Sequence, residues 1–363
     1  MRDWAKNLGL LVLSLLALLL ASEGALRLFP VSEGLRAQPV NQQSPVLHFE
    51  PNGTRTWSAF GDMAMANRVR VNNVGFVNDQ DYEPAAPGPL VAVVGDSFVE
   101  AAMVPYAQTL HGRLAAALRD RARVYSFAAS GAPLSQYLAY AAYARDRFHP
   151  KRGVVVVVGN DFDESLLEYK AAPGFHSFRR RPDGGAELAR MDYAPSALRG
   201  ALRHSRLALY LANNLGIGSL PARLRGLFAP KTAFVGQTSA SLDEKRLLDS
   251  LFAIDAFLAM LPQAFDLPPE DILLVLDAPR PDLYDPQARN AAQSSYFGRM
   301  RSALMQRARA AGVRVVDMQE HFLRDYGQNG QRFEFPRDGH WNAHGHQVAA
   351  QAVLESGVLD GLR

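Results

Sequence analysis

The sequence contains no cysteine among its 363 residues. This absence excludes disulfide bonds, thiolate catalysis and a lipidated N-terminal cysteine. It does not exclude a location outside the cytoplasm, because a chain of this length can bury a stabilising core without covalent cross-links. The length allows one large domain or two ordinary ones.

Several functional signatures are also missing from the chain. No Gly-rich phosphate loop, His-Glu-x-x-His zinc motif or dinucleotide fingerprint occurs, so we expect neither a metal ion nor another cofactor. The net charge is only +3, and no basic stripe with interleaved aromatic residues is present, which argues against a nucleic-acid partner. Apolar residues make up 48% and charged residues 21%, which is typical of a globular protein rather than a disordered one.

The N-terminus has the layout of a secretory signal. Arg2 and Lys6 precede an apolar run over residues 8–21, and the apolar pattern resumes over residues 25–29. No clear Ala-x-Ala cleavage site follows, so we expect residues 1–29 to stay in place as a signal anchor. The bulk of the chain would then be exported to the periplasm or another extracytoplasmic space. The alternative is a signal peptide that is removed, followed by secretion.

Residues 30–88 are rich in Pro, Gly, Asn and Gln and have few long apolar runs. We expect a tether followed by peripheral structure. Residues 69–77 are a candidate for a short edge strand, although a surface loop packed on the main domain is the stronger interpretation.

From residue 89 to the C-terminus, short apolar segments alternate with segments of helical periodicity. Apolar runs rich in β-branched residues predict strands buried on both faces. Alternation with helices predicts an α/β fold, a three-layer α/β/α sandwich around a mainly parallel five-stranded sheet. The expected strands are residues 91–94, 123–127, 153–158, 272–276 and 313–318, and the expected helices are 110–119, 135–148, 243–261, 296–311 and 344–354.

The pattern loosens over residues 162–242, which we interpret as an insertion in the domain spanning residues 89–363. Charge, Pro and Gly-Gly over residues 175–194 predict a hairpin or a mobile excursion, residues 197–211 a helix and residues 216–241 a loop. We expect a lid or wall near the carboxyl edge of the sheet. A disordered surface loop is the alternative.

Three expected strands end in polar turns that contain glycine: Gly95-Asp96-Ser97, Ser130-Gly131 and Gly159-Asn160-Asp161. Ligands collect at the carboxyl edge of such sheets, and Ser97 stands there at the start of a helix. A nucleophilic serine also needs a base and donors for an oxyanion. Asp338 and His340 precede the last helix and suit that role. Without the other blocks, Ser97 could also be interpreted as a residue that only caps the following helix.

Together these blocks resemble those of the SGNH/GDSL hydrolase family. The resemblance implies that Ser97 is the nucleophile and that an oxyanion hole is formed by the backbone N–H groups of Ser97 and Gly131 and by the side chain of Asn160. The segment His340-Trp341-Asn342-Ala343-His344-Gly345-His346 is similar to the family's last block, which makes His340 the base.

One position departs from the commoner form of that last block. The family usually places its aspartate three residues before the histidine, where this chain has Arg337; Asp338 lies two before. An Asp-x-His-Trp arrangement is similar to that of SGNH-like proteins in polysaccharide O-acetylation. We therefore expect Asp338 to orient His340, and a backbone carbonyl is the alternative.

Other polar residues near these blocks have less specific interpretations. Arg280 follows the fourth expected strand and is a candidate substrate contact or salt-bridge partner, and Asp161 is a turn residue that could border the site. His344 and His346 are expected to cap, pack or face water. Glu100, one turn after Ser97, is expected to be a solvated or hydrogen-bonded helix residue.

The resemblance therefore implies a serine esterase that forms an acyl-serine intermediate. Its expected substrate is an O-acetylated exported glycan or a small ester, and membrane attachment would come from the N-terminal helix. The first alternative is an O-acetyltransferase that passes the acyl group to a polysaccharide hydroxyl, with exopolysaccharide-assembly proteins as partners. The second is a non-catalytic carbohydrate-binding or assembly protein on the same scaffold.

Overall fold

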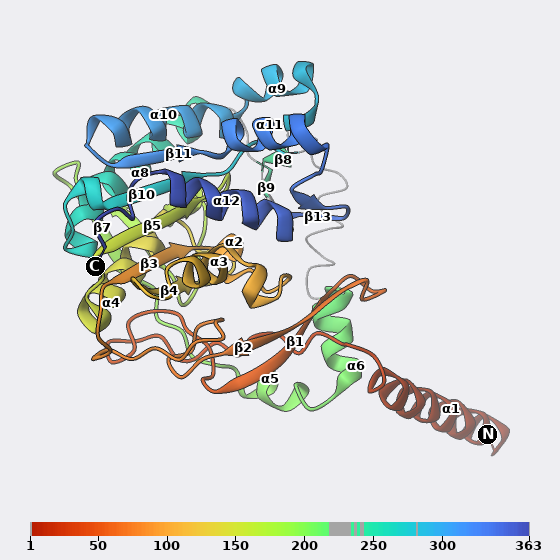
Figure 1. The fold of residues 1–363 in the computed structure, drawn as a ribbon. Helices are drawn as coiled ribbons and strands as arrows, with labels where there is room; N and C mark the ends of the chain where they lie inside the picture. Colours follow the sequence, from red (N-terminus) through yellow and green to blue (C-terminus); the bar gives the residue numbers. More distant parts are fainter. Residues whose placement is uncertain (1, 218–233, 236–237, 240–242, 281, 363) are drawn as a thin grey trace. The chain divides into compact units, whose positions relative to one another are not determined.

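The structure is a computed structural model that describes residues 2–217, 234–235, 238–239, 243–280 and 282–362 (Figure 1). The chain forms two compact units. The first contains Met1–Arg36, Thr54–Val69 and Pro195–Pro230, and the second contains Ala37–Gly53, Arg70–Ala194 and Lys231–Arg363. The predicted boundaries after residues 29 and 88, and the predicted insertion over residues 162–242, stay predictions.

The second unit is built on a five-stranded parallel sheet with the order β11-β10-β5-β3-β4. This confirms the predicted sheet. Every residue of β3 is buried, which explains why its sequence is an unbroken apolar run. The strand order places the topological switch point between β3 and β5, where α/β sheets collect ligands. The strands are β3 (Leu90–Gly95), β4 (Arg123–Ala128), β5 (Arg152–Val157), β10 (Ile272–Leu276) and β11 (Arg314–Asp317).

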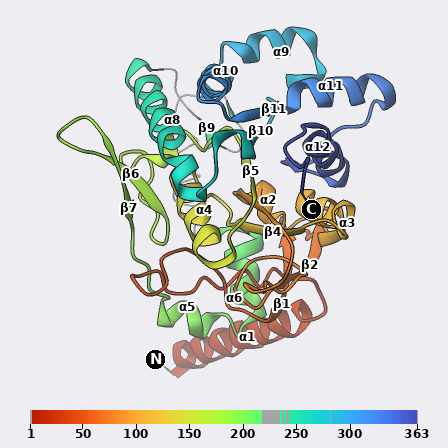
Figure 2. The ribbon, with the colours of Figure 1, turned by 60° about the vertical axis from the view of Figure 1, so that its left-hand side comes forward.

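Helices cover both faces of this sheet, as the three-layer prediction required. Figure 2 shows α4 and α8 on one side and α3 and α12 on the other. Alternate residues such as Val91 and Val93 point toward Leu114 of α3 and Val353 of α12 in one core cluster. The helices of this unit are α2 (Ser97–Glu100), α3 (Leu110–Ala117), α4 (Leu134–Phe148), α8 (Glu244–Phe265), α9 (Pro286–Gln293), α10 (Tyr296–Ala310), α11 (Met318–Asn329) and α12 (Ala343–Glu355), with short η turns at Tyr106–Gln108, Asp163–Ser165, Pro269–Asp271 and Asp282–Tyr284.

Smaller two-stranded sheets accompany the main sheet. The hairpin predicted within residues 175–194 is present as antiparallel β6 (His176–Arg180) and β7 (Ala186–Arg190). Strands β12 (Glu334–Phe335) and β13 (Asp338–Trp341) also pair antiparallel. The predicted loop over residues 216–241 falls mostly outside the described residues, apart from the antiparallel pair β8 (Phe234–Val235) and β9 (Thr238–Ser239).

Two local predictions differ from the structure. Residues 69–77, for which a surface loop was the stronger interpretation and a short edge strand the other, contain the end of β2 (Met65–Val71) followed by a turn, and β2 pairs with β1 (Gly53–Ala59) in a separate two-stranded sheet. The helix expected over residues 197–211 is broken into α5 (Ala197–Leu202) and α6 (Arg206–Leu209), which continues into the π-helical η3 (Tyr210–Asn214). The break occurs because the Ser205 side chain caps a new helix by accepting a hydrogen bond from the Ala208 N–H.

The N-terminal helix α1 (Arg2–Leu26) is apolar, and its side chains are largely exposed within its own unit. At 25 residues it is about 38 Å long, enough to cross a hydrocarbon core of about 30 Å. By length and composition α1 can cross a membrane, and signal sequences share both properties. Helix α8 has similar length and composition, but it is partly buried as a core helix of the sheet.

Candidate active site

Ser97 lies at the junction between β3 and α2, where the strand ends at Gly95 and the helix begins. The Asp96 carboxylate caps this helix by accepting a 2.9 Å hydrogen bond from the Phe98 N–H. Gly95 is required for the close approach of helix to strand, because a Cβ atom there would lie 2.5 Å from Cγ2 of Val99. The turn therefore places the Ser97 hydroxyl at the carboxyl edge of the sheet.

The structure brings the three residues of the predicted triad together. Nε2 of His340 lies 2.8 Å from Oγ of Ser97, although 243 residues separate them. On the other side of the ring, Nδ1 of His340 hydrogen-bonds Oδ1 of Asp338, which also accepts a 2.8 Å hydrogen bond from the His340 N–H. A proton on Nδ1 leaves Nε2 as the acceptor for the serine hydroxyl. The Ser97 hydroxyl has a second, longer contact of 3.2 Å to Oδ2 of Asp96.

The carboxylates near this triad have pKa values shifted in opposite directions. Burial acts to raise the pKa of Asp338, but the hydrogen bonds and charge of His340 outweigh it, and the pKa of Asp338 lies below its ordinary value. Burial raises the pKa of Asp96 and of Glu100 above their ordinary values. Asp338 is thus held as the charged partner of the imidazole, as a triad requires.

A tryptophan and an arginine hold the His340 segment in place. Nε1 of Trp341 donates a 2.8 Å hydrogen bond to Oδ1 of Asp277, at the end of β10. Arg280 pairs with the other oxygen of Asp277 at 2.6 Å and donates to the Gly339 carbonyl at 2.9 Å. The Arg280 side chain is only 3% exposed, so the salt bridge predicted as the alternative to substrate contact is present. Sequence reasoning missed Asp277, although an aspartate directly after a buried strand was the available signal.

The predicted oxyanion donors follow β4 and β5, the two strands hydrogen-bonded to β3. Glu100 is buried and accepts hydrogen bonds from the N–H and the hydroxyl of Ser130, at 2.9 and 2.7 Å, which fixes the turn before Gly131. Gly131 has φ +78°, a left-handed conformation that favours glycine. The Asn160 amide donates to Glu164 at 3.3 Å. The roles of Ser97, Gly131 and Asn160 as oxyanion donors stay predictions.

The position of Asp161 does not allow a direct contact with a substrate. It is fully buried, and its Oδ2 accepts hydrogen bonds from the Tyr137 hydroxyl at 2.9 Å and the Val158 N–H at 2.8 Å. A side chain with no exposed surface cannot contact a substrate directly, so the position of Asp161 argues for a structural role. Burial, together with the charge of Asp96, raises its pKa well above the ordinary value.

The two histidines that follow His340 in the last block have packing contacts. Nε2 of His344 hydrogen-bonds Asp325 at 2.6 Å, and the ring stacks on Phe333. His346 is buried, and its Nδ1 accepts a hydrogen bond from the Leu110 N–H at 3.1 Å. These contacts agree with the capping or packing roles expected for both. Within the described part of the chain, no group of three His, Cys, Asp or Glu side chains is placed to hold a metal ion.

A cavity of about 760 Å³ borders this site in the same unit. Its lining mixes aromatic and proline side chains with cationic and carboxylate ones. It reaches the candidate triad through Phe98, Asp338 and Gly339. The lining residues are Phe98, Asp277–Arg280, Phe297, Arg332, Glu334–Gly339 and Asn342.

The structure is that of an α/β protein in which the Ser97, His340 and Asp338 side chains are arranged as in a serine-hydrolase triad. Residues 255–357 match the family model described as SGNH hydrolase-like domain, acetyltransferase AlgX. Residues 255–357 are thus similar to an SGNH hydrolase-like domain, which agrees with the resemblance seen in the sequence. The matched residues include Asp338, His340 and Trp341.

Solved structures with some likeness to this chain have low identity. An α/β hydrolase, LAE5, from the metagenome of Lake Arreo, Spain, is 16% identical, with 76% of this chain and 98% of that chain covered and a TM-score of 0.41. TesA is 14% identical, with 76% of this chain and 99% of that chain covered and a TM-score of 0.37. The acetyl xylan esterase AlAXEase is 11% identical over 74% and 98%, with a TM-score of 0.38. A search of curated proteins returned no match. These likenesses are too distant to indicate a substrate.

Proposed function

We propose that this chain is a serine acylhydrolase that works through an acyl-serine intermediate. The observation that carries the proposal is the 2.8 Å contact between Oγ of Ser97 and Nε2 of His340, with Asp338 bonded to the other ring nitrogen. A hydroxyl in contact with an imidazole that a carboxylate orients is an activated nucleophile.

The reaction begins when Oγ of Ser97 attacks the ester carbonyl carbon and Nε2 of His340 takes the hydroxyl proton. The carbonyl oxygen becomes an oxyanion, which the N–H groups of Ser97 and Gly131 and the Asn160 amide stabilise. Collapse of this intermediate breaks the ester C–O bond, and the leaving alcohol takes the proton from His340. Water then attacks the acyl-serine, again giving its proton to Nε2, and the free acid leaves as Ser97 regains its proton. Asp338 stabilises the charged imidazolium in both halves of the reaction.

The substrate that we propose is an O-acetylated exported glycan or a small acetyl ester. The description of the matched family model names an acetyltransferase, and this supports an acetyl group as the acyl part of the substrate. The cavity of about 760 Å³ beside the triad has both aromatic and charged side chains in its lining, and this mixture supports a saccharide as the alcohol part.

A second candidate function is O-acetyl transfer to a polysaccharide hydroxyl. The family model that covers Asp338, His340 and Trp341 is that of the acetyltransferase AlgX, and this favours transfer as a real alternative. The chemistry is the same up to the acyl-serine. A sugar hydroxyl, in place of water, then attacks the acyl carbon and gives its proton to His340. Polysaccharide-assembly proteins would be the partners of such an enzyme.

We also propose that α1 anchors the chain in a membrane with the catalytic unit on the extracytoplasmic side. Arg2 and Lys6 lie at the N-terminal end of the apolar helix, and positive charge favours the cytoplasmic side. A removed signal peptide is the alternative.

The test measures the fate of the acetyl group from acetylated glycans and short-chain esters, with and without an acceptor oligosaccharide. Free acetate from the wild type but not from Ser97→Ala supports the hydrolase. Acetyl groups that appear on the acceptor support the transferase. A fluorophosphonate probe should label Ser97, and a folded wild type that never labels would favour a non-catalytic binding or assembly protein instead.

A further inference from the structure

Two charged side chains connect Gly131 with Asn160, the residues predicted to donate to the oxyanion from outside the Ser97 turn. Nζ of Lys170 donates hydrogen bonds to the Gly131 carbonyl at 2.7 Å and to Oε2 of Glu164 at 2.5 Å. The same Glu164 oxygen accepts a 3.3 Å hydrogen bond from the Asn160 side-chain amide. Strand β3, which ends beside Ser97, lies between β4 and β5, so these bonds join the turns on its two sides. We call Lys170 and Glu164 the bridging pair.

The turn that contains Gly131 is held by charged groups on both sides. Glu100 accepts a 2.9 Å hydrogen bond from the Ser130 N–H, and Lys170 donates to the Gly131 carbonyl. These bonds fix the peptides on either side of the Gly131 N–H, and this restricts the positions that the N–H can take. A Cβ atom at residue 131 would lie 3.3 Å from Nζ of Lys170, so the glycine also leaves room for the ammonium group.

Glu164 orients the side-chain amide of Asn160. A primary amide carries two N–H donors, so a bond to Glu164 leaves the second donor for an oxyanion. An unpaired carboxylate close to an oxyanion would disfavour the negative charge that forms there. The ion pair with Lys170 offsets the charge of Glu164. Glu164 can therefore hold the amide without placing an uncompensated negative charge beside the site.

The bridging pair stands on a segment with its own hydrogen bonds. The Lys170 N–H donates to the Leu166 carbonyl at 3.1 Å, and Ser165, directly after Glu164, donates its hydroxyl to the Asp161 carbonyl at 2.5 Å. The side chains of the bridging pair are 25% and 16% exposed, and ion pairs that retain contact with water add little to stability. Their contacts with both predicted donors indicate a role in the reaction.

We propose that Lys170 and Glu164 are positioning residues for acyl transfer, which hold the Gly131 N–H and the Asn160 amide as a pair of donors. The bridging pair acts through these donors and does not touch the substrate. An oxyanion forms in both halves of the reaction, so displaced donors slow the formation and the breakdown of the acyl-serine. The inference rests on the acyl-serine chemistry proposed above.

Acetate release by the full chain from a short-chain acetyl ester tests this inference. Lys170→Met removes the ammonium group and keeps the length of the side chain, and Glu164→Met removes the acceptor that Lys170 and Asn160 share. We expect each variant to lower kcat and kcat/KM by the same factor, roughly tenfold to hundredfold, because the interactions lost are made in the transition state. The unfolding temperature should change little.

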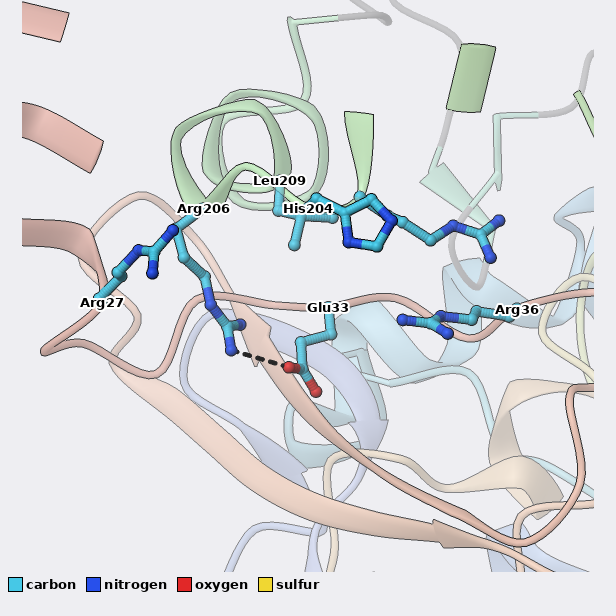
Figure 3. A pocket seen from close by; sticks show the side chains of 7 residues that line it. Arg27, Glu33, Arg36, His204, Arg206 and Leu209 are labelled. Atoms are coloured by element: carbon cyan, nitrogen blue, oxygen red, sulfur yellow. Dashed lines mark ion pairs between the residues drawn. The ribbon is translucent and has the colours of Figure 1, made fainter. Parts of the chain in front are cut away.

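Glu33→Met in the first unit is a matched control. Glu33 pairs with Arg206 at 2.9 Å and accepts a 2.9 Å hydrogen bond from the Thr56 N–H, so it has the same two kinds of partner as Glu164. Figure 3 shows this ion pair at a hollow of about 400 Å³. We expect the control to keep the wild-type kcat.

A double-mutant cycle separates positioning from a general effect on the fold. In Asn160→Ala the amide that Glu164 orients is absent, and the Lys170 bond to Gly131 remains. We therefore expect Glu164→Met to lower kcat by less than about threefold in the Asn160→Ala background, compared with roughly tenfold or more in the wild type. A purely structural role would give the same factor in both backgrounds.

Three results would overturn the inference: a wild-type kcat in a folded Lys170→Met or Glu164→Met protein, an equal loss of kcat in Glu33→Met, or equal effects of Glu164→Met in the two backgrounds. Failure of the proposed function gives a different result. A folded wild type that releases no acetate and takes up no fluorophosphonate contradicts the acyl-serine and the bridging pair together. An active wild type with unaffected variants contradicts only the bridging pair.

Discussion

The indole nitrogen of Trp341 donates a 2.8 Å hydrogen bond to the carboxylate of Asp277. Helices α9, α10 and α11 separate these two residues along the chain. The bond connects the strand that carries His340 to the end of β10, and Arg280 bonds to the same carboxylate. Both partners are buried, and the indole N–H depends on this carboxylate for its hydrogen bond. The imidazole is therefore positioned by the sheet itself, and this relationship leads to the first prediction.

Trp341→Phe should destabilise the protein and lower the turnover rate. The change removes the donor to Asp277 and part of a fully buried ring, and we expect a loss of about 2–4 kcal/mol. Urea unfolding measures the stability, and acetate release measures kcat and KM. The half-buried Trp57 provides a control, since Trp57→Phe leaves the His340 segment intact. A Trp341→Phe enzyme with normal kcat would show that this bond does not position His340.

Ser97→Ala should abolish acyl transfer and leave the fold unchanged. Removal of a serine nucleophile lowers the rate by roughly 10⁴–10⁶-fold. The experiment combines acetate release with fluorophosphonate labelling and a thermal unfolding curve. Full activity in a stable Ser97→Ala protein would contradict the proposed acyl-serine.

Asp338→Asn should lower the rate by roughly 10⁴-fold, because an amide neither stabilises the imidazolium nor enforces the tautomer in which Nε2 accepts. The pKa of Asp338 lies below its ordinary value, so the wild-type carboxylate stays charged at all pH values above about 3.8. We therefore expect the variant's defect to persist across the neutral and mildly acidic range of a pH–rate profile. A defect of less than tenfold would point to a backbone carbonyl as the group that orients His340.

Gly131→Ala should impair catalysis more than it impairs stability. A Cβ atom at φ +78° costs about 1–2 kcal/mol and would lie 3.3 Å from Nζ of Lys170, which displaces the N–H proposed for the oxyanion hole. Gly184 is a matched control, because it has φ +82° with open space around its Cβ position in the β6–β7 hairpin. Both variants should lose similar stability in thermal unfolding, and only Gly131→Ala should lose kcat. Equal kcat in the two variants would show that the Gly131 N–H does not contribute to the oxyanion hole.

Asp161→Asn should change how stability depends on pH. Burial raises the pKa of Asp161, so the folded protein holds this proton at pH values where the unfolded chain, with an ordinary pKa near 3.8, has lost it. The contribution of Asp161 to the free energy of unfolding of the wild type is greatest below pH 3.8. This contribution is lost as the pH rises through the raised pKa. Asparagine cannot ionise, and its side-chain oxygen can still accept from Tyr137 and Val158. The unfolding temperature of the variant relative to wild type should therefore rise as the pH increases above about 3.8. A constant difference would contradict the shifted pKa.

The sequence by itself determined the sheet, the triad candidates and the apolar N-terminal helix. Runs such as residues 91–94 and 153–158 have one favourable environment, a strand buried on both faces, so local pattern was enough to predict them. Ser97 and His340 stood in blocks whose order along the chain carried the resemblance. For Arg280 and Asp161 the sequence left two interpretations open, a substrate contact or a structural role, and could not choose between them.

Only the tertiary structure decided which groups meet. Packing brings His340 to Ser97 across 243 residues, pairs Trp341 with Asp277, and bonds Glu100 to Ser130. It also buries Asp161 and breaks the predicted helix before Arg206, where Glu23 and Ser205 satisfy the new N-terminus. Side-chain periodicity fixes the secondary structure of a segment, but hydrogen-bond partners and burial depend on residues brought together from distant parts of the chain.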